Sequence, residues 1–266
     1  MPERPGDEAP VVSIGDPAGS YRRRIRMVTT QAGVVVGGLE DDFHYFEIEL
    51  RHADGVVTHV DASSRRWPWA TCPAAGHQLH ALEGMALSPR CTAVAKVADP
   101  RMNCTHQFDL AGLCVAHAGR GDTVRQYDVE LPGVRDGVTH PRLARDGEPL
   151  LEWTLAWEGF TRRLVDPPPY SDAPWQGGFI RWADEHFDPL AAEAAIVLRR
   201  SCEIGMGRGM DLEAYEKAAD IGEYQVGICY SQQPGINTVA FRTKGTIRDF
   251  DRHPDALLLH TPDAPG

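Results

Sequence analysis

Alternation of apolar and polar residues in the first third of the chain predicts a series of β-strands. The clearest case is Phe43–Leu50, where every second residue from His44 onward would share one face of a strand. Asp54-Gly55 is a strong signal for a hairpin turn between two such strands. The predicted strands are Tyr21–Thr30, Val34–Val36, Phe43–Leu50 and Val56–Ala62. We therefore expect this third of the chain to fold as an antiparallel meander.

Apolar residues spaced three and four apart predict helices farther along the chain. Within Thr105–His117, such a stripe is formed by Phe108, Ala111 and Val115. The segment Asp188–Ile204 begins with an Asp-Pro pair and ends before a glycine, as helices prefer. The other predicted helices are Pro73–Met85 and Leu212–Ala219, and the other predicted strands are Val124–Leu131, Leu150–Trp157, Tyr224–Tyr230 and Val239–Thr246.

Three segments are expected from these patterns. Residues 1–20 are rich in Pro, Gly, Asp and Glu and predict a mobile arm. The proline run in Asp166–Tyr170 is a stiff connector and marks the best candidate boundary. We expect a main α+β domain over 21–165, an antiparallel sheet packed with several helices. Residues 166–266 would form a helical C-terminal extension, either separate or part of that domain.

Composition narrows the classes of function. The 266 residues are 42% hydrophobic and 24% charged, which is typical of an ordinary globular protein. The net charge of −11 argues against nucleic acid as a partner, and no apolar run approaches the roughly 20 residues of a membrane helix. The N-terminus lacks the apolar core of a signal peptide, so we expect a cytoplasmic protein whose six cysteines are reduced.

The segment Asn103–Leu110 places a thiol and an imidazole two residues apart at the expected start of a helix. Cys104 and His106 can each act as a nucleophile, an acid–base group or a metal ligand near neutral pH. Because a helix N-terminus favours a thiolate, we expect a lowered pKa for Cys104 and faster alkylation than for Cys114. The alternative is a buried cysteine beside a core or helix-capping histidine, a common fate of both residue types.

Three more residues extend this candidate site. His44 lies on the apolar face of its strand, and we expect it to converge with His106 unless it is a satisfied core histidine. Asp61 ends its strand and would orient a histidine or cap a turn. Cys72 precedes a proline at an expected helix start. The set that would hold zinc is His44, Cys72, Cys104 and His106, although its spacing matches no zinc motif.

Two other patterns suggest substrate binding. Arg22, Arg24 and Arg26 would face the same way on the first strand and could hold a carboxylate or phosphate, or simply protect an exposed edge. The two tryptophans of Trp67–Trp69 could line a pocket for a flat apolar molecule, or cover the core. The predicted substrate-binding residues are Arg24, Tyr45, Trp67 and Trp69.

The order of these motifs resembles a bacterial family catalogued as domain of unknown function 2889. The matching features are the Arg-rich strand, His44, Asp61, Pro68, Cys72, Leu82-Glu83-Gly84 and Cys104-Thr105-His106. The resemblance covers about residues 21–118 and departs at Asn103, where the family usually has glycine. It implies that the candidate site residues belong together, and it implies catabolism of aromatic or lipid-like acids without supplying a reaction.

The sequence therefore predicts an enzyme acting on a small, partly aromatic or apolar organic acid. The predicted catalytic residues are His44, Asp61, Cys104 and His106. Since no nucleotide motif is present, a lyase or hydrolase is favoured over an oxidoreductase or kinase. The alternatives are a non-catalytic small-ligand-binding protein and a structural zinc module. The expected partner is a small molecule, and a homo-oligomer is compatible with the sequence.

Overall fold

The structure is a computed structural model of the chain and describes residues 9, 12, 18–158 and 161–262. The strands are β1 (Tyr21–Gln31), β2 (Val34–Asp41), β3 (Tyr45–Ala53), β4 (Val56–Arg66), β5 (Val124–Leu131), β6 (Val138–Thr139), β7 (Arg142–Arg145), β8 (Glu148–Glu152), β9 (Thr154–Glu158) and β10 (Thr161–Asp166). The α-helices are α1 (Thr105–Arg120), α2 (Phe179–His186) and α3 (Pro189–Ile204). The 3₁₀ helices are η1 (Pro73–Leu82), η2 (Cys91–Lys96), η3 (Pro100–Met102), η4 (Tyr170–Asp172), η5 (Gly205–Gly209), η6 (Leu212–Ala214), η7 (Ala218–Ile221), η8 (Glu223–Gln225), η9 (Tyr230–Gln232) and η10 (Pro254–Ala256). Most of the predicted N-terminal arm lies outside the described residues.

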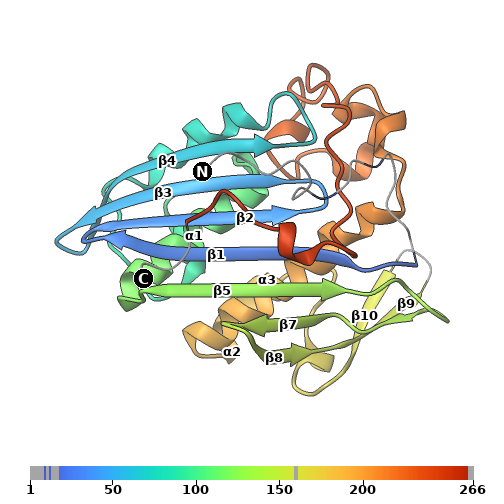
Figure 1. Cartoon of the computed structure of the whole chain (residues 1–266), viewed down its shortest axis with the longest axis horizontal. Coiled ribbons are helices and arrows are strands. Elements are labelled where there is room, and N and C mark those ends of the chain that lie inside the picture. Colours follow the sequence, from blue (N-terminus) through green and yellow to red (C-terminus); the bar gives the residue numbers. More distant parts are fainter. Residues whose placement is uncertain (1–8, 10–11, 13–17, 159–160, 263–266) are drawn as a thin grey trace.

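A seven-stranded antiparallel sheet organises the molecule (Figure 1), with the strand order β4-β3-β2-β1-β5-β7-β8. The first four strands are neighbours in both sequence and space, so the predicted meander is confirmed. A second sheet has the order β10-β9-β6. Together with the helices, these sheets confirm the α+β fold class.

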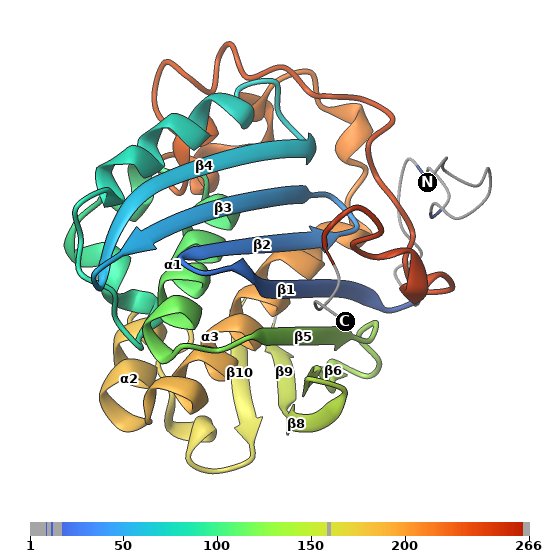
Figure 2. The ribbon, with the colours of Figure 1, turned by 60° about the vertical axis from the view of Figure 1, so that its left-hand side comes forward.

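The helices α1 and α3 cover one face of the large sheet (Figure 2). The predicted stripe of α1 is buried in the main hydrophobic core. Helix α1 approaches β2 closely at Gly37, where a Cβ atom would lie 2.5 Å from Sγ of Cys114. The carboxylate of Asp188 accepts hydrogen bonds from Leu190 and Ala191, which confirms the predicted N-cap of α3. These contacts fix both helices on the sheet.

The C-terminal segment crosses the opposite face of the sheet (Figure 1). The backbone N–H of Leu258 donates to the carboxylate of Glu40 over 2.7 Å, and the Thr261 hydroxyl donates to Glu47 over 3.0 Å. Both glutamates point away from the helical face, since side chains alternate along a strand. The two faces of the sheet therefore carry separate sets of polar residues.

The C-terminal half differs most from the sequence-based expectation. Leu150–Trp157 was expected to be one strand, but it divides at the fully buried Trp153 into β8 and β9, which belong to different sheets. Tyr224–Tyr230 and Val239–Thr246 contain turns and isolated bridges instead of strands, and Leu212–Ala219 contains 3₁₀ turns. Apolar residues in these loops are partly exposed, so their spacing along the sequence does not indicate the buried face of a strand.

Other local expectations need smaller corrections. The predicted helix Pro73–Met85 is a 3₁₀ helix that ends at Leu82. The short strands β6, β7 and β10 and helix α2 were not predicted, because their sequences are too short to establish a period.

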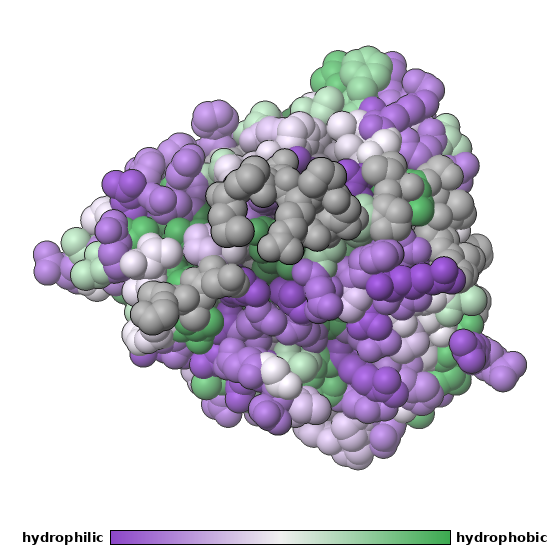
Figure 3. Space-filling view, viewed as in Figure 1, coloured by the Kyte–Doolittle hydropathy of each residue, from purple (hydrophilic) through white to green (hydrophobic). Residues whose placement is uncertain are grey.

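No helix in the described part of the chain has the length and apolar character needed to cross a bilayer. The face drawn in Figure 3 is mainly hydrophilic, with hydrophobic patches scattered between polar side chains.

Candidate active site around two stacked histidines

The tight turn between β2 and β3 is organised by the carboxylate of Asp41. Its Oδ1 atom accepts hydrogen bonds from the backbone N–H groups of Phe43 at 2.8 Å and His44 at 2.9 Å. The same oxygen lies 2.9 Å from Nδ1 of His44. Asp residues favour such turns because the short side chain reaches the backbone two or three residues ahead. The turn thus fixes the His44 ring as well as the chain direction.

The second oxygen of Asp41 is held by two residues of β1. Oδ2 accepts hydrogen bonds from the Tyr21 hydroxyl at 2.8 Å and from Nε and Nη2 of Arg23 at 3.0 and 2.5 Å. Both side chains of the Arg23–Asp41 pair are essentially inaccessible to solvent. Burial alone would raise the pKa of Asp41, but the neighbouring His44 and Arg23 hold it well below its usual value. Asp41 is therefore a buried carboxylate anion with both oxygens fully used.

His106 lies in the first turn of α1 and stacks on His44. The ring centroids are 3.6 Å apart, with an angle of 26° between the ring planes. The predicted convergence of these two histidines is confirmed, although they lie far apart in the sequence. Nε2 of His106 is buried and has no hydrogen-bond partner among the residues that the structure describes. An unpaired buried polar atom is unusual in a folded protein and calls for an explanation.

Both imidazoles are neutral near pH 7. Burial lowers the pKa of His44, and the Asp41 carboxylate opposes this effect only in part. Burial also lowers the pKa of His106 well below its usual value, and the neighbouring His44 and Arg23 lower it further. The pair is therefore able to accept a proton without carrying one beforehand.

These lowered pKa values predict that His44 and His106 each contribute a loss of stability as the solution becomes more acidic, while Asp42, whose pKa burial raises to about 7, contributes with the opposite sign. Below the ordinary histidine pKa of 6.5, the unfolded chain takes up protons that His44 and His106 do not take up in the folded state. The contribution of each such histidine to the free energy of unfolding should then fall by about 1.4 kcal/mol per pH unit. Urea unfolding between pH 7 and pH 5 measures this slope. His106→Ala should reduce it, whereas an equal slope in this variant would contradict the prediction.

The residue that orients His44 is Asp41, and the predicted Asp61 is not in the site. Asp61 is exposed in the middle of β4, opposite Glu49, because β4 continues to Arg66. The expectation placed the end of this strand too early. The exposed side chain of Asp61 thus has no part in the histidine pair.

The two predicted cysteines lie in a second hydrophobic cluster. The cluster consists of Phe46, Trp69, Cys72, Ala75, Cys104, Ala218 and Ala240. Sγ of Cys72 lies 3.5 Å from the Ser231 hydroxyl, and burial raises the pKa of Cys72 to about 12. Among the described residues, the group whose ligand atoms approach within 4.8 Å of the two histidines contains Asp41 instead of these cysteines. The predicted Cys2His2 zinc set is therefore not assembled.

The expectation of a lowered pKa for Cys104 is wrong. Cys104 is the N-cap residue of α1, as its position in the sequence indicated. Its thiol is nevertheless buried, and desolvation raises its pKa well above the usual value. The pKa of Cys114 is also raised by burial. Desolvation outweighs the helix N-terminus here, so the structure provides no reason for Cys104 to react faster than Cys114.

The four predicted substrate-binding residues are dispersed. Arg24 is paired with Asp128 at 2.6 Å on the face covered by the C-terminal segment. Trp69 is buried in the second cluster, and Trp67 packs against the same cluster. Tyr45 lies on the face opposite the histidines, where its hydroxyl accepts a hydrogen bond from the backbone N–H of His260. Tyr45 is the member of the set that lines a cavity.

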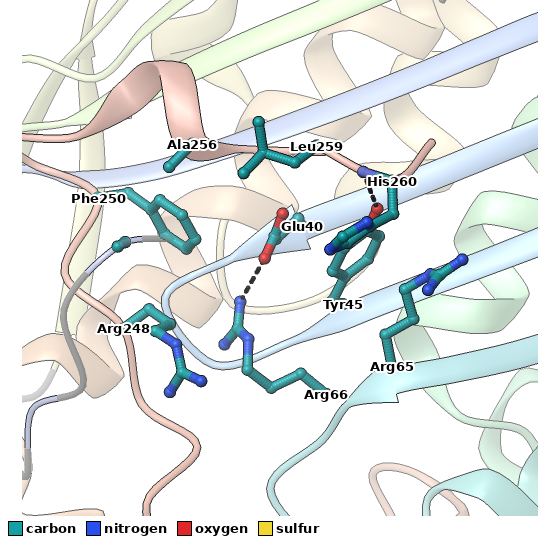
Figure 4. Close-up of a pocket in the computed structure, with 10 residues that line it drawn as sticks. Glu40, Tyr45, Arg65, Arg66, Arg248, Phe250, Ala256, Leu259 and His260 are labelled. Atoms are coloured by element: carbon teal, nitrogen blue, oxygen red, sulfur yellow. Dashed lines mark hydrogen bonds and ion pairs between the residues drawn. The ribbon is translucent and has the colours of Figure 1, made fainter. Parts of the chain in front are cut away.

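That cavity has a volume of about 240 Å³ and lies between the sheet and the C-terminal segment (Figure 4). Figure 4 shows Arg65, Arg66 and Arg248 around it, together with the carboxylate of Glu40. Nη2 of Arg66 lies 3.0 Å from Oε1 of Glu40. Three guanidinium groups and one carboxylate give the lining a positive charge in an otherwise acidic protein.

Sequence reasoning missed Tyr21, Arg23 and Asp41. A usable signal was present, because Arg23 alternates with the neighbouring arginines and must face the core beside Tyr21 and Ile25. A buried arginine requires an anionic partner, which Asp41 at the end of the next strand supplies.

The Asp41 carboxylate is poorly placed to bind a metal ion, because both of its oxygens already accept hydrogen bonds. The carboxylate is thus suited to hold His44 rather than to ligate an ion.

Comparison of the chain with known protein families, curated proteins and solved structures found no match. The resemblance to domain of unknown function 2889 consequently remains a prediction. Any assignment of function to this chain therefore depends on the geometry of its own residues.

Proposed function

We propose that the chain is a small-molecule enzyme in which His44 and His106 form the acid–base pair. The observation that carries this proposal is the stacking of two buried imidazoles, one held by Asp41 and the other with an unpaired nitrogen. Burying polar rings in this way costs stability. Positions that sacrifice stability are typical of functional sites.

Asp41 determines which nitrogen of His44 is reactive. Because the carboxylate accepts the hydrogen of Nδ1, Nε2 of His44 is the nitrogen that can take up a proton. The carboxylate would then stabilise the imidazolium that forms, as in the Asp–His part of a hydrolase triad. Asp41 is thus a positioning residue, and His44 is the proposed general base.

His106 would be the second ring able to hold the proton that the pair takes up. The close stacking opposes a positive charge on both rings at once. The pair therefore holds only one proton beyond those of the two neutral imidazoles. In a lyase the pair would remove a proton from the substrate and return it to the leaving group, while in a hydrolase it would remove a proton from water and return it to the product. The arrangement suits both reaction classes. Cys104 has no role in the proposed step, since its buried thiol remains protonated.

An organic acid with an aromatic or apolar part is the proposed substrate. The buried Phe46 ring packs beside the pair and makes its surroundings apolar, with ring centroids 5.8 Å from His44 and 6.1 Å from His106. Arg23 is a nearby cation, although its guanidinium is committed to Asp41. These neighbours favour a substrate whose reacting carbon is flanked by apolar groups.

A panel of aryl esters, 3-hydroxy acids and unsaturated acids tests the proposed function. The wild-type chain should convert at least one of them, and His44→Ala should lower the rate by about 10²- to 10⁴-fold. His140→Ala, which alters an exposed histidine outside the pair, should retain the wild-type rate. Unchanged turnover in His44→Ala, or an inactive wild type across all three classes, would argue against the proposal.

The cavity beside Tyr45 favours a second candidate function, the binding of a small organic anion. Its guanidinium groups suit a carboxylate, and the rings of Tyr45 and Phe250 suit an attached aromatic group. Benzoate binding should be measurable by calorimetry and weaker by about tenfold in Arg65→Gln. Arg51→Gln is the matched control, because Arg51 is also paired with a glutamate on the sheet surface. Equal binding by both variants would exclude Arg65 from the site.

A further inference from the structure

A second group of metal-ligating side chains lies at the edge of the large sheet, apart from the stacked histidines. β4 is an edge strand, and the chain that follows η1 is hydrogen-bonded to the first residues of β4. The N–H of Gly84 donates to the Val57 carbonyl at 2.8 Å, and the N–H of Val57 donates to the Met85 carbonyl at 2.9 Å. These backbone hydrogen bonds hold Glu83 in a fixed position beside β4.

Two histidines converge on Glu83 from different elements. Oε1 of Glu83 lies 2.9 Å from Nδ1 of His59 on β4 and 2.8 Å from Nδ1 of His80 on η1. The ligand atoms of all three residues lie within 4.8 Å of one another. The three side chains remain between 35% and 47% exposed, so an ion from solution can reach them. A third imidazole, His77, has its ring centroid 6.2 Å from that of His80.

The spacing of these atoms is close to that of a coordinated metal ion. Zinc–ligand bonds of about 2.0–2.2 Å in a tetrahedral site place neighbouring ligand atoms roughly 3.3–3.6 Å apart. The observed distances from the carboxylate oxygen to the two nitrogens, 2.9 and 2.8 Å, are about 0.4–0.8 Å shorter than this tetrahedral spacing. Exposed side chains can move by this amount, while the backbone of the site stays in place.

The charges also suit a divalent cation. Oε1 of Glu83 accepts a hydrogen bond from each of the two imidazoles, and this carboxylate supplies the negative charge of the group. A metal ion bound between the three side chains would take the place of these two hydrogen atoms. Two imidazoles and a carboxylate, with a fourth position open to water, are a ligand set typical of zinc.

We propose that His59, His80 and Glu83 bind one divalent transition-metal ion, with Zn²⁺ as the best chemical fit. The ion would link η1 to the edge strand β4, since its ligands come from both sides of that contact. This site is independent of the proposed acid–base pair, because it shares no residue with Asp41, His44 or His106.

Calorimetric titration of the full chain with ZnCl₂ at pH 7.5 tests the proposal. The wild type should bind one equivalent at this site, and His80→Ala and Glu83→Gln should each weaken binding by at least about tenfold. Even loss of an outer partner of a ligand typically costs about 10- to 100-fold in affinity. Saturating Zn²⁺ should raise the melting temperature of the wild type but not that of His80→Ala.

Control variants separate this site from other histidines. His140→Ala removes an exposed histidine outside the group and should bind Zn²⁺ like the wild type. His106→Ala should also still bind one equivalent of Zn²⁺ at the site formed by His59, His80 and Glu83. The proposal is overturned if the wild type takes up no Zn²⁺, if His80→Ala binds it as tightly as the wild type, or if the equivalent disappears in His106→Ala.

Discussion

Asp41→Ala is expected to lower the free energy of unfolding by about 3–5 kcal/mol, the usual cost of removing one partner from a buried ion pair. Asp41 is the buried partner of Arg23, whose side chain is only 1% exposed. Without the carboxylate, the guanidinium would remain in the core with its charge uncompensated. The substitution would also release the Tyr21 hydroxyl and two backbone N–H groups of the β2–β3 turn. Urea unfolding followed by circular dichroism gives the change in midpoint.

A neighbouring pair that also starts from β1 but joins it to β5 provides a matched control. Arg24 and Asp128 are also an Arg–Asp pair on adjacent strands, with a distance of 2.6 Å between Nε and Oδ1, but they are 18% and 30% exposed. Because solvent can replace the lost partner, Asp128→Ala should cost only about 0–1 kcal/mol. Similar losses in Asp128→Ala and Asp41→Ala would contradict the interpretation that burial makes the Asp41 network important.

Regular amphipathic elements were predictable from the sequence because each carries its own periodic signal. The strand pattern around Ile48 and the capping pattern at Asp188 depend on neighbours only a few residues away. The C-terminal loops lack such a signal, because their apolar residues respond to contacts with distant segments. An example is Phe241, which forms an isolated bridge with Lys217. Local patterns therefore predicted the meander and the long helices better than the final block.

The candidate site was predictable in part for the same reason. His44 and His106 could be expected to meet, since one is on the inward face of a strand and the other starts a helix that packs on the sheet. The choice of Asp61 over Asp41 failed because strand ends are poorly marked in sequence. The pKa of Cys104 could not be predicted from its place at a helix start, because burial depends on the tertiary fold.

His106→Ala and Phe108→Ala are expected to have opposite effects on activity and stability. Phe108 is buried in the main core, so its truncation should leave a cavity that costs about 3–5 kcal/mol. His106 is equally buried but leaves Nε2 without a hydrogen-bond partner among the described residues. Removing an unsatisfied buried group recovers about 1–3 kcal/mol of desolvation cost, which offsets the cavity left by the ring. His106→Ala should therefore melt close to the wild type.

If the two histidines perform the chemistry, His106→Ala should lose activity and Phe108→Ala should keep it, the reverse of their effects on stability. Under the proposed function, His106→Ala should lose about 10²- to 10⁴-fold in turnover, while folded Phe108→Ala, assayed well below its melting temperature, should retain much of its activity. Thermal melts beside the substrate panel measure both quantities on the same preparations. A His106→Ala variant that melts far below the wild type would make His106 a structural residue of the core. The stacked imidazoles would then be a packing contact, and the unpaired nitrogen would need another explanation.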